Sequence, residues 1–215
     1  MRRVTAMVLL LYLAVGGPAW SAPFSQVIIF GDSLSDTGNV LEATNGLIPG
    51  PPYSNGRFSN GPTYAEVLTA NLGASAVSSL HGGTNYAFGG ARTDAHFLGP
   101  FATVLGQVAS YQVQTTKADP NALYIVFAGA NNLQDAIMAA GSDPSNAAAI
   151  GRSVVTNAID DLQSILTSLD DLGANNVLIP NVPDLGEVPR VLERGEAASQ
   201  FATSLSLDFN QSLAS

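Results

Sequence analysis

The sequence contains no cysteine and has few charged residues, of which the smaller part is basic. Without cysteine, disulfides, thiolate catalysis and cysteine-ligated zinc or iron–sulfur sites are excluded, so a chain of 215 residues must rely on its core. Lys and Arg number 8 against 17 Asp and Glu, and the formal net charge of −9 disfavours nucleic acid and anionic membranes as partners. Charged residues amount to 12% and apolar residues to 46%, which indicates a folded domain rather than a disordered chain.

The N-terminus has the organisation of a secretory signal peptide. Arg2 and Arg3 form a short positive region, and the apolar segment 7–15 follows them. Ala19 and Ser21 then place small residues at the −3 and −1 positions of a cleavage site. We therefore expect export, either to the periplasm or out of the cell.

Cleavage after Ser21 is the predicted processing step, with Ala22 as the alternative boundary and an uncleaved anchor as the alternative role. Residues 1–21 would then be the signal peptide, and residues 22–215 one domain. Removal of two of the eight basic residues changes the formal net charge from −9 to −11. No later segment approaches the roughly 20 apolar residues of a membrane span, so no integral span is expected after cleavage.

Short apolar runs and helical periodicities alternate along the rest of the chain. Strands are predicted at residues 27–30, 84–87, 123–127 and 177–179. Helices are predicted at residues 62–72, 104–113, 146–172 and 197–214. This alternation predicts a three-layer α/β/α sandwich with a mostly parallel sheet and right-handed crossovers. In such sheets ligands bind beyond the carboxyl ends of the strands, so the catalytic residues are sought in the loops there.

Turn-forming residues mark the ends of these elements. The segment 47–62 is rich in Gly, Pro and Asn and is predicted to be an extended loop. Pro62 suits the first turn of the helix that follows. Gly173 stands where the long helix 146–172 requires a C-cap.

The loop after the first predicted strand, residues 31–39, places Ser33 at the head of a turn or helix. A serine held there has its hydroxyl facing the cleft, and the backbone N–H groups at a helix start stabilise negative charge. The alternative is an ordinary Asp/Ser helix cap. Ser35 stands where the α/β-hydrolase elbow needs glycine, and Leu34 interrupts the oxygen ligands of a calcium loop, so both of those motifs are excluded.

Two later loops carry groups that could stabilise an oxyanion. Gly89 and Gly90 follow the second predicted strand and let a backbone N–H approach a substrate closely. Asn131 follows the third, where its side-chain amide could donate to the same oxygen. An ordinary turn is the alternative for each loop. Their order is more informative, because the three loops would share one edge of a parallel sheet.

Five stretches are similar to the conserved blocks of the GDSL, or SGNH, hydrolase family, in its secreted bacterial branch. They are residues 29–39, residues 55–62 with Glu66, residues 85–91, residues 129–132, and residues 181–186 with Phe209 and Asn210. The resemblance implies a flavodoxin-like α/β/α fold and carboxylic-ester hydrolysis through an acyl-serine intermediate, with no metal or cofactor. The implied substrate is a small-molecule, lipid or carbohydrate ester. Among these, we expect acyl esters of modest length.

The resemblance also implies the roles of individual residues. Ser33 would be the nucleophile, and its own N–H an oxyanion donor. Gly90 would supply the second donor; it is preferred to Gly89 because the family places this glycine five residues after an asparagine, here Asn85. Asn131 would supply the third donor through its side chain. The family usually has aspartate at the next position, where this chain has asparagine, a departure expected to alter local hydrogen bonding more than the chemistry.

The family's C-terminal Asp-x-x-His block, which supplies the general base, has no counterpart in this sequence. The only histidines are His81 and His96, and neither lies in such a motif. His96 as a substitute base is the less favoured alternative. We therefore expect the last strand–helix unit of the fold to be missing and the activity of the chain as written to be feeble. A non-catalytic ester- or glycan-binding module and a poorly folding product of a decaying gene are the alternative hypotheses.

Overall fold

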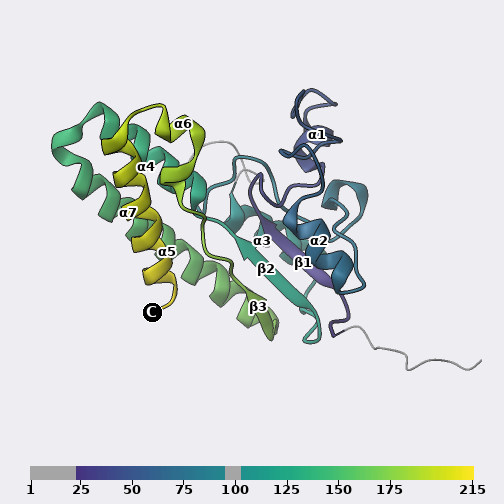
Figure 1. Ribbon diagram of the computed structural model, residues 1–215. Coiled ribbons are helices and arrows are strands. Elements are labelled where there is room, and N and C mark those ends of the chain that lie inside the picture. Colours follow the sequence, from purple (N-terminus) through teal and green to yellow (C-terminus); the bar gives the residue numbers. More distant parts are fainter. Residues whose placement is uncertain (1–22, 95–102) are drawn as a thin grey trace, which may run out of the picture.

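Three parallel strands form the centre of the computed structural model, which describes residues 23–94 and 103–215 (Figure 1). The sheet order is β1 (Val27–Gly31), β2 (Leu123–Phe127) and β3 (Asn176–Leu178). Every residue of β1 and β2 is buried, which explains their unbroken apolar sequences. Because all strands run the same way, their carboxyl ends share one edge. The structure confirms the predicted α/β fold with a parallel sheet.

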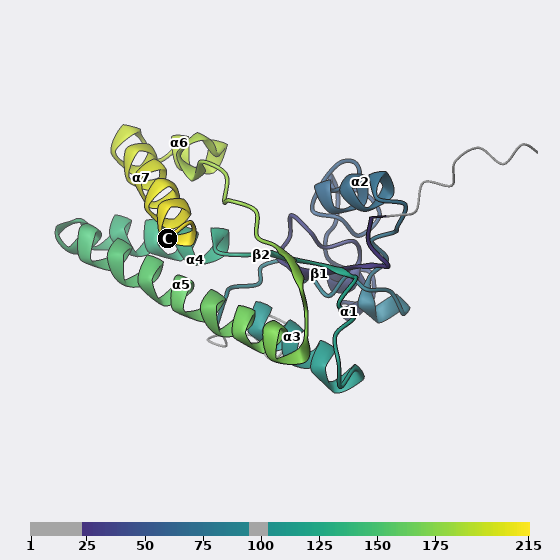
Figure 2. The ribbon, with the colours of Figure 1, turned by 90° about the horizontal axis from the view of Figure 1, so that it is seen from below.

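Helices cover both faces of this sheet, as Figure 2 shows. The described residues form α1 (Asn39–Ala43), α2 (Tyr64–Asn71), α3 (Val104–Gln114), α4 (Ala130–Ser142), α5 (Ala147–Leu172), α6 (Pro189–Leu192) and α7 (Glu196–Leu213). Short 3₁₀ turns lie at Ser79–His81, Pro144–Asn146 and Leu185–Glu187. Helix α2 packs on one face, whereas α3 and α5 pack on the other. Helices α4, α6 and α7 lie toward the carboxyl ends of the strands (Figure 1).

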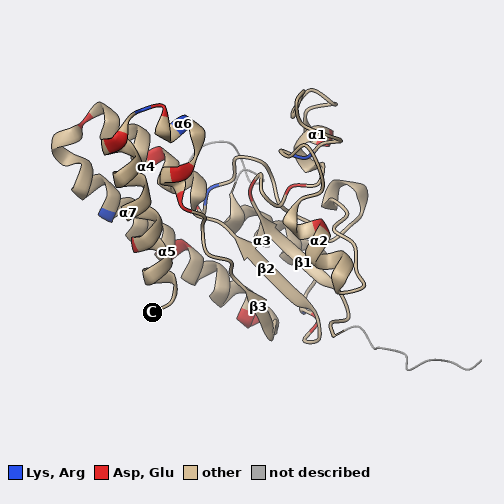
Figure 3. Cartoon of the chain, in the orientation of Figure 1, with Lys and Arg blue, Asp and Glu red and all other residues tan. Residues whose placement is uncertain are grey.

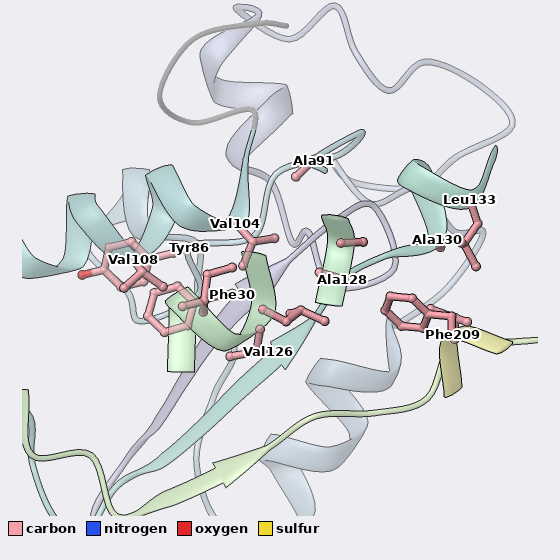
Figure 4. Packing of buried hydrophobic residues seen from close by; sticks show 14 of the residues in the cluster. Phe30, Tyr86, Ala91, Val104, Val108, Val126, Ala128, Ala130, Leu133 and Phe209 are labelled. Atoms are coloured by element: carbon pink, nitrogen blue, oxygen red, sulfur yellow. The ribbon is translucent and has the colours of Figure 1, made fainter. Parts of the chain in front are cut away.

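The alternation of side chains along β1 divides the core in two. Val27 and Ile29 pack under α2, and Ile28 and Phe30 point into the larger cluster formed with α3, α4, α5 and α7. Figure 4 shows Phe30 beside Tyr86 in this larger cluster, and their rings stack with centroids 5.6 Å apart. Full burial of each large apolar side chain contributes about 1.5–3 kcal/mol. The sheet is thus a rigid support for the loops at its carboxyl edge.

The strand predicted at residues 84–87 is wrong. The segment is extended beside β1, with the Ile29 N–H donating to the Thr84 carbonyl at 3.0 Å and the Tyr86 N–H to the Ile29 carbonyl at 2.7 Å, but it forms only isolated bridges. On its other side the backbone of residues 77–79 pairs with Asn85 alone, the Asn85 N–H donating to the Val77 carbonyl at 3.0 Å and the Ser79 N–H to the Asn85 carbonyl at 2.7 Å. The Asn39 amide donates to the carbonyls of Asn85 and Ala87 at 2.8 and 2.9 Å.

The helices differ from the sequence predictions in two respects, the start of α2 and the presence of helices that were not predicted. Helix α2 begins at Tyr64, because Thr63 caps it and Glu66 completes the capping box, so Pro62 precedes the cap rather than lying in the first turn. Helices α1, α4 and α6 were not predicted. The remaining predicted helices are present, and Gly173 ends α5 in the left-handed conformation as expected, with φ of 95°.

Two predictions fall outside the described residues, namely the signal peptide over residues 1–21 and any role of His96. Within the two described ranges, no helix combines the length and apolar character that crossing a membrane requires.

Candidate active site

Ser33, Gly90 and Asn131 line one open cleft of about 610 Å³ at the carboxyl edge of the sheet. Ser33 lies two residues after β1, Gly90 follows the extended segment beside it, and Asn131 is the second residue of α4. The structure therefore brings together the three residues that the sequence singled out. The rest of the lining is mainly apolar and includes Leu34, Tyr53, Phe58, Pro183, Leu185 and Val188.

The serine turn is anchored by a buried glutamine of α3. The Gln107 side chain accepts from the Gly31 N–H and donates to the Gly31 carbonyl, both at 2.8 Å. Asp32 then accepts from the Leu34 N–H at 2.9 Å, which closes the turn around Ser33. Ser33 itself is partly exposed, and its hydroxyl has no hydrogen bond to another described residue. A rigid backbone thus presents a free hydroxyl to the cleft.

A second buried carboxylate joins the serine turn to the glycine loop. Asp36 accepts from the N–H groups of Gly38 and Asn39, both at 2.8 Å, and from the Gly89 N–H at 2.9 Å. Burial raises the pKa of Asp36, although the N–H donors oppose that change. Gly90 follows directly with φ of +85°, a conformation that favours glycine. The glycine loop is therefore held against the serine turn.

The start of α4 orients Asn131. Its side-chain amide donates to the Ala91 carbonyl at 2.9 Å and makes a longer contact of 3.4 Å to the Asp32 carboxylate. Beneath it, Gly129 has φ of +109°, and a Cβ there would lie 2.4 Å from the Phe209 ring. Figure 4 shows Phe209 of α7 beside Ala130 at this point. Of its two hydrogen bonds, the one to Asp32 is the longer and therefore the weaker.

Asp32 is the most perturbed acid of the cleft. Burial raises its pKa from 3.8 to about 6, and the Leu34 N–H opposes the change. Its carboxylate holds the serine turn and contacts the Asn131 amide, so it links the serine turn to the start of α4. No group of three or more His, Asp or Glu side chains in the described part of the chain is placed to hold a metal ion.

A sequence model of the family described as GDSL-like Lipase/Acylhydrolase matches residues 27–214. The chain belongs to this family. The match includes Ser33, Gly90 and Asn131, so the GDSL serine and both candidate donors lie inside the matched region.

Several curated proteins are similar to this GDSL domain over most of its length. Lipase 1 of Photorhabdus luminescens is 30% identical over 187 residues, which cover 86% of this chain and 26% of that protein. A phosphatidylcholine-sterol acyltransferase of Aeromonas hydrophila is 31% identical, and the match covers 89% of this chain and 56% of that protein. Esterase EstA of Pseudomonas aeruginosa is also 31% identical, and the match covers 99% of this chain and 36% of that protein. The chain thus spans between about a quarter and a little over half of these relatives.

The one described histidine of the GDSL domain does not line the cleft that contains Ser33. His81 bonds through Nδ1 to the Ser78 hydroxyl at 2.7 Å and through Nε2 to the Glu42 carboxylate at 3.3 Å. It lines a separate pocket of about 350 Å³ together with Arg57. His81 is therefore not positioned to deprotonate Ser33.

Other positions of the GDSL blocks have structural roles. Arg57 binds Glu66 through two hydrogen bonds of 2.6 Å, which ties the loop 44–63 to α2. Asn132, where the family usually has aspartate, accepts from the Thr93 N–H at 3.1 Å and donates to its hydroxyl at 2.9 Å. Sequence reasoning missed Gln107, whose one available signal was a polar side chain on the apolar face of a predicted helix.

Proposed function

We propose that this domain hydrolyses carboxylic esters, with Ser33 as the nucleophile. The observation that supports the proposal most strongly is the convergence of Ser33, Gly90 and Asn131 from three separate loops on one cleft. Each group has the chemistry that acyl transfer needs, namely a hydroxyl free of other bonds, a backbone N–H in a glycine turn, and a fixed amide. The mainly apolar lining suits an acyl chain of modest length.

In the proposed reaction, the Ser33 oxygen attacks the ester carbonyl carbon and forms a tetrahedral intermediate. The N–H groups of Ser33 and Gly90 and the Asn131 amide would stabilise its oxyanion. Expulsion of the alcohol leaves an acyl-serine, which water then hydrolyses to the free acid and Ser33. The serine proton needs a general base, which the family supplies from its Asp-x-x-His block.

Because no histidine of this sequence stands in that motif, we expect slow turnover by the chain as written. The loss of a triad member typically leaves a rate about 10³–10⁴-fold above water, from the oxyanion donors and binding. The proposal is therefore tested by the identity of the acylated residue as well as by turnover.

The experiment is to incubate the chain with p-nitrophenyl butyrate or a fluorophosphonate probe and to locate the adduct by mass spectrometry. We expect modification of Ser33, loss of the adduct in Ser33→Ala, and an unchanged adduct in Ser164→Ala, which changes an exposed serine of α5. Asn131→Ala should slow acylation by about 10²–10³-fold. Equal modification of the Ser33→Ala variant would refute the assignment. Binding of a substrate analogue with no Ser33 adduct would favour the non-catalytic binding module instead.

Export is a separate part of the proposal. The charge, apolar segment and small residues of positions 1–21 support a signal peptide cleaved after Ser21. N-terminal sequencing of the protein recovered outside the cytoplasm of an expressing bacterium should begin at Ala22. Recovery of the protein only with an intact leader would contradict this.

A further inference from the structure

The wall of the cleft contributed by α6 carries an arginine, Arg190, which is the one basic side chain among the described residues of the lining. Pro189 occupies the first turn of α6, and Val191 is buried with 3% exposure, so the short helix is docked firmly while Arg190 is exposed. Arg190 also lines an adjoining cavity of about 110 Å³ together with Arg194.

The guanidinium of Arg190 is not neutralised by the protein. Arg57 and Arg92 line two other pockets, and each is held by two hydrogen bonds of 2.6 to 2.7 Å, Arg57 to Glu66 and Arg92 to Asp135. Arg190, in contrast, makes no hydrogen bond or ion pair with any described residue. Arg152 and Arg194 are likewise unpaired among the described residues, but neither lines this cleft, so Arg190 is the free guanidinium that faces it. Figure 3 shows acidic residues spread over the helices around α6.

The acidic groups near the cleft determine where a negative charge could bind. Asp32 lies beside Ser33, and above its pKa of about 6 its carboxylate repels an anion at that end of the cleft. Glu187 and Glu193 flank Arg190 along the chain, but both are exposed and neither pairs with it. An anionic group is therefore favoured at the α6 wall and disfavoured beside the nucleophile.

We propose that Arg190 binds an oxyanion of the substrate, a carboxylate or phosphate, while the ester lies at Ser33, so that the domain prefers amphiphilic esters with a negative charge. The inference rests on the proposed function for the position of the ester. The planar guanidinium has a fork of donors that matches these anions, and its weak hydration makes the contact favourable.

Binding without turnover gives the first test, in the Ser33→Ala protein. Isothermal titration with hexylphosphonate and with its neutral dimethyl ester separates the contribution of the charge to affinity from that of the alkyl chain. We expect the anion to bind about tenfold tighter or more, as for hydrogen bonds to charged groups. Arg190→Gln should abolish the preference, and high salt should weaken it. The matched control is Arg152→Gln on α5, which removes the same charge outside the cleft lining and should retain the preference.

A preference that survives Arg190→Gln would overturn the inference, and so would an equal loss in the Arg152→Gln control, because that result would mean a general charge effect. Titration of benzoate and hexylphosphonate against the same variants separates a carboxylate ligand from a phosphonate-type ligand. Either anion supports the proposal if Arg190 is required.

Kinetics gives the second test, with 4-butyryloxybenzoate and its neutral methyl ester as a matched pair. Arg190→Gln should lower kcat/KM for the anionic ester about tenfold more than for the neutral ester, through KM. Ser33-dependent hydrolysis of the neutral ester tests the proposed function, whereas the ratio between the two esters tests Arg190. Failure of the two proposals is thus distinguishable, and an unchanged ratio would contradict the inference.

Discussion

Replacement of Asp32 by asparagine should stabilise the fold at neutral pH, although the residue lines the cleft beside Ser33. The side chain is 1% exposed, and burial raises its pKa from 3.8 to about 6. A pKa difference of this size corresponds to about 3 kcal/mol, at about 1.36 kcal/mol per pH unit. Asparagine has nearly the same shape and can still accept from the Leu34 N–H, but it never ionises.

The sign of the pH dependence follows from the two pKa values of Asp32. The unfolded chain loses this proton near pH 3.8 and the folded chain near pH 6, so between these values the folded state binds more protons. The free energy of unfolding therefore falls as the pH rises through this window. Asp32→Asn removes that fall. The variant should match the wild type near pH 4 and exceed its stability by about 3 kcal/mol above pH 7.

Urea unfolding of both proteins over this pH range is the assay. Asp36, whose pKa burial also raises, is present in both proteins and cancels in the difference. The control is Asp170→Asn, which changes an exposed aspartate of α5 and should leave the stability nearly unchanged. A stability difference that does not grow between pH 4 and pH 7, or that has the opposite sign, would refute the reasoning. Because Asp32 contacts the Asn131 amide, the stabilised variant should also acylate more slowly.

Two further substitutions test how the cleft is built. Gln107→Leu should lower the free energy of unfolding by about 2–4 kcal/mol in urea titrations, because it leaves the buried N–H and carbonyl of Gly31 without the partners they have now; an unchanged midpoint would mean that water replaces the side chain. Gly129→Ala should lower the free energy of unfolding by about 2 kcal/mol or more, because φ is +109° and the new methyl group would meet the Phe209 ring. Thermal melting measures this loss. The control is Gly141→Ala at an exposed position of α4, which should not destabilise the protein.

Elements with a strong local pattern could be predicted from the sequence, and elements fixed by tertiary contacts could not. β1, β2 and α5 have unbroken apolar runs or a long regular period, so their positions follow from burial alone. In contrast, Gly129 precedes α4 and two asparagines stand in its first turn, and these residues locally favour a turn. It is a helix because Leu133 and Ile137 pack into the core cluster shared with α5 and α7.

The candidate site divides in the same way. Ser33, Gly90 and Asn131 could be placed together in advance, because loops after neighbouring parallel strands must meet at one edge of the sheet. The position of Gln107 beneath the serine turn and that of Arg190 in the cleft lining could not be predicted, because they depend on how α3 and α6 dock, and docking leaves no short-range pattern in the sequence. The mistaken strand at residues 84–87 has a similar cause, since the segment pairs with its neighbours only at isolated bridges and the Asn39 side chain binds the Asn85 and Ala87 carbonyls.

The polar groups under the cleft explain why the first and second family blocks, residues 29–39 and 85–91, occur together in one sequence. Asn39 of the first block binds carbonyls of the second, and Asn85 of the second donates to the Ser35 carbonyl of the first at 2.7 Å. Asp36 adds a bond from the first block to Gly89. In the described part of the chain, no buried side-chain nitrogen or oxygen lacks a hydrogen-bond partner. A partly satisfied network would cost more than an apolar core, so each of these residues requires the others. The serine turn and the glycine loop are therefore positioned as one unit, and the donor geometry of the cleft depends on that buried network more than on either loop alone.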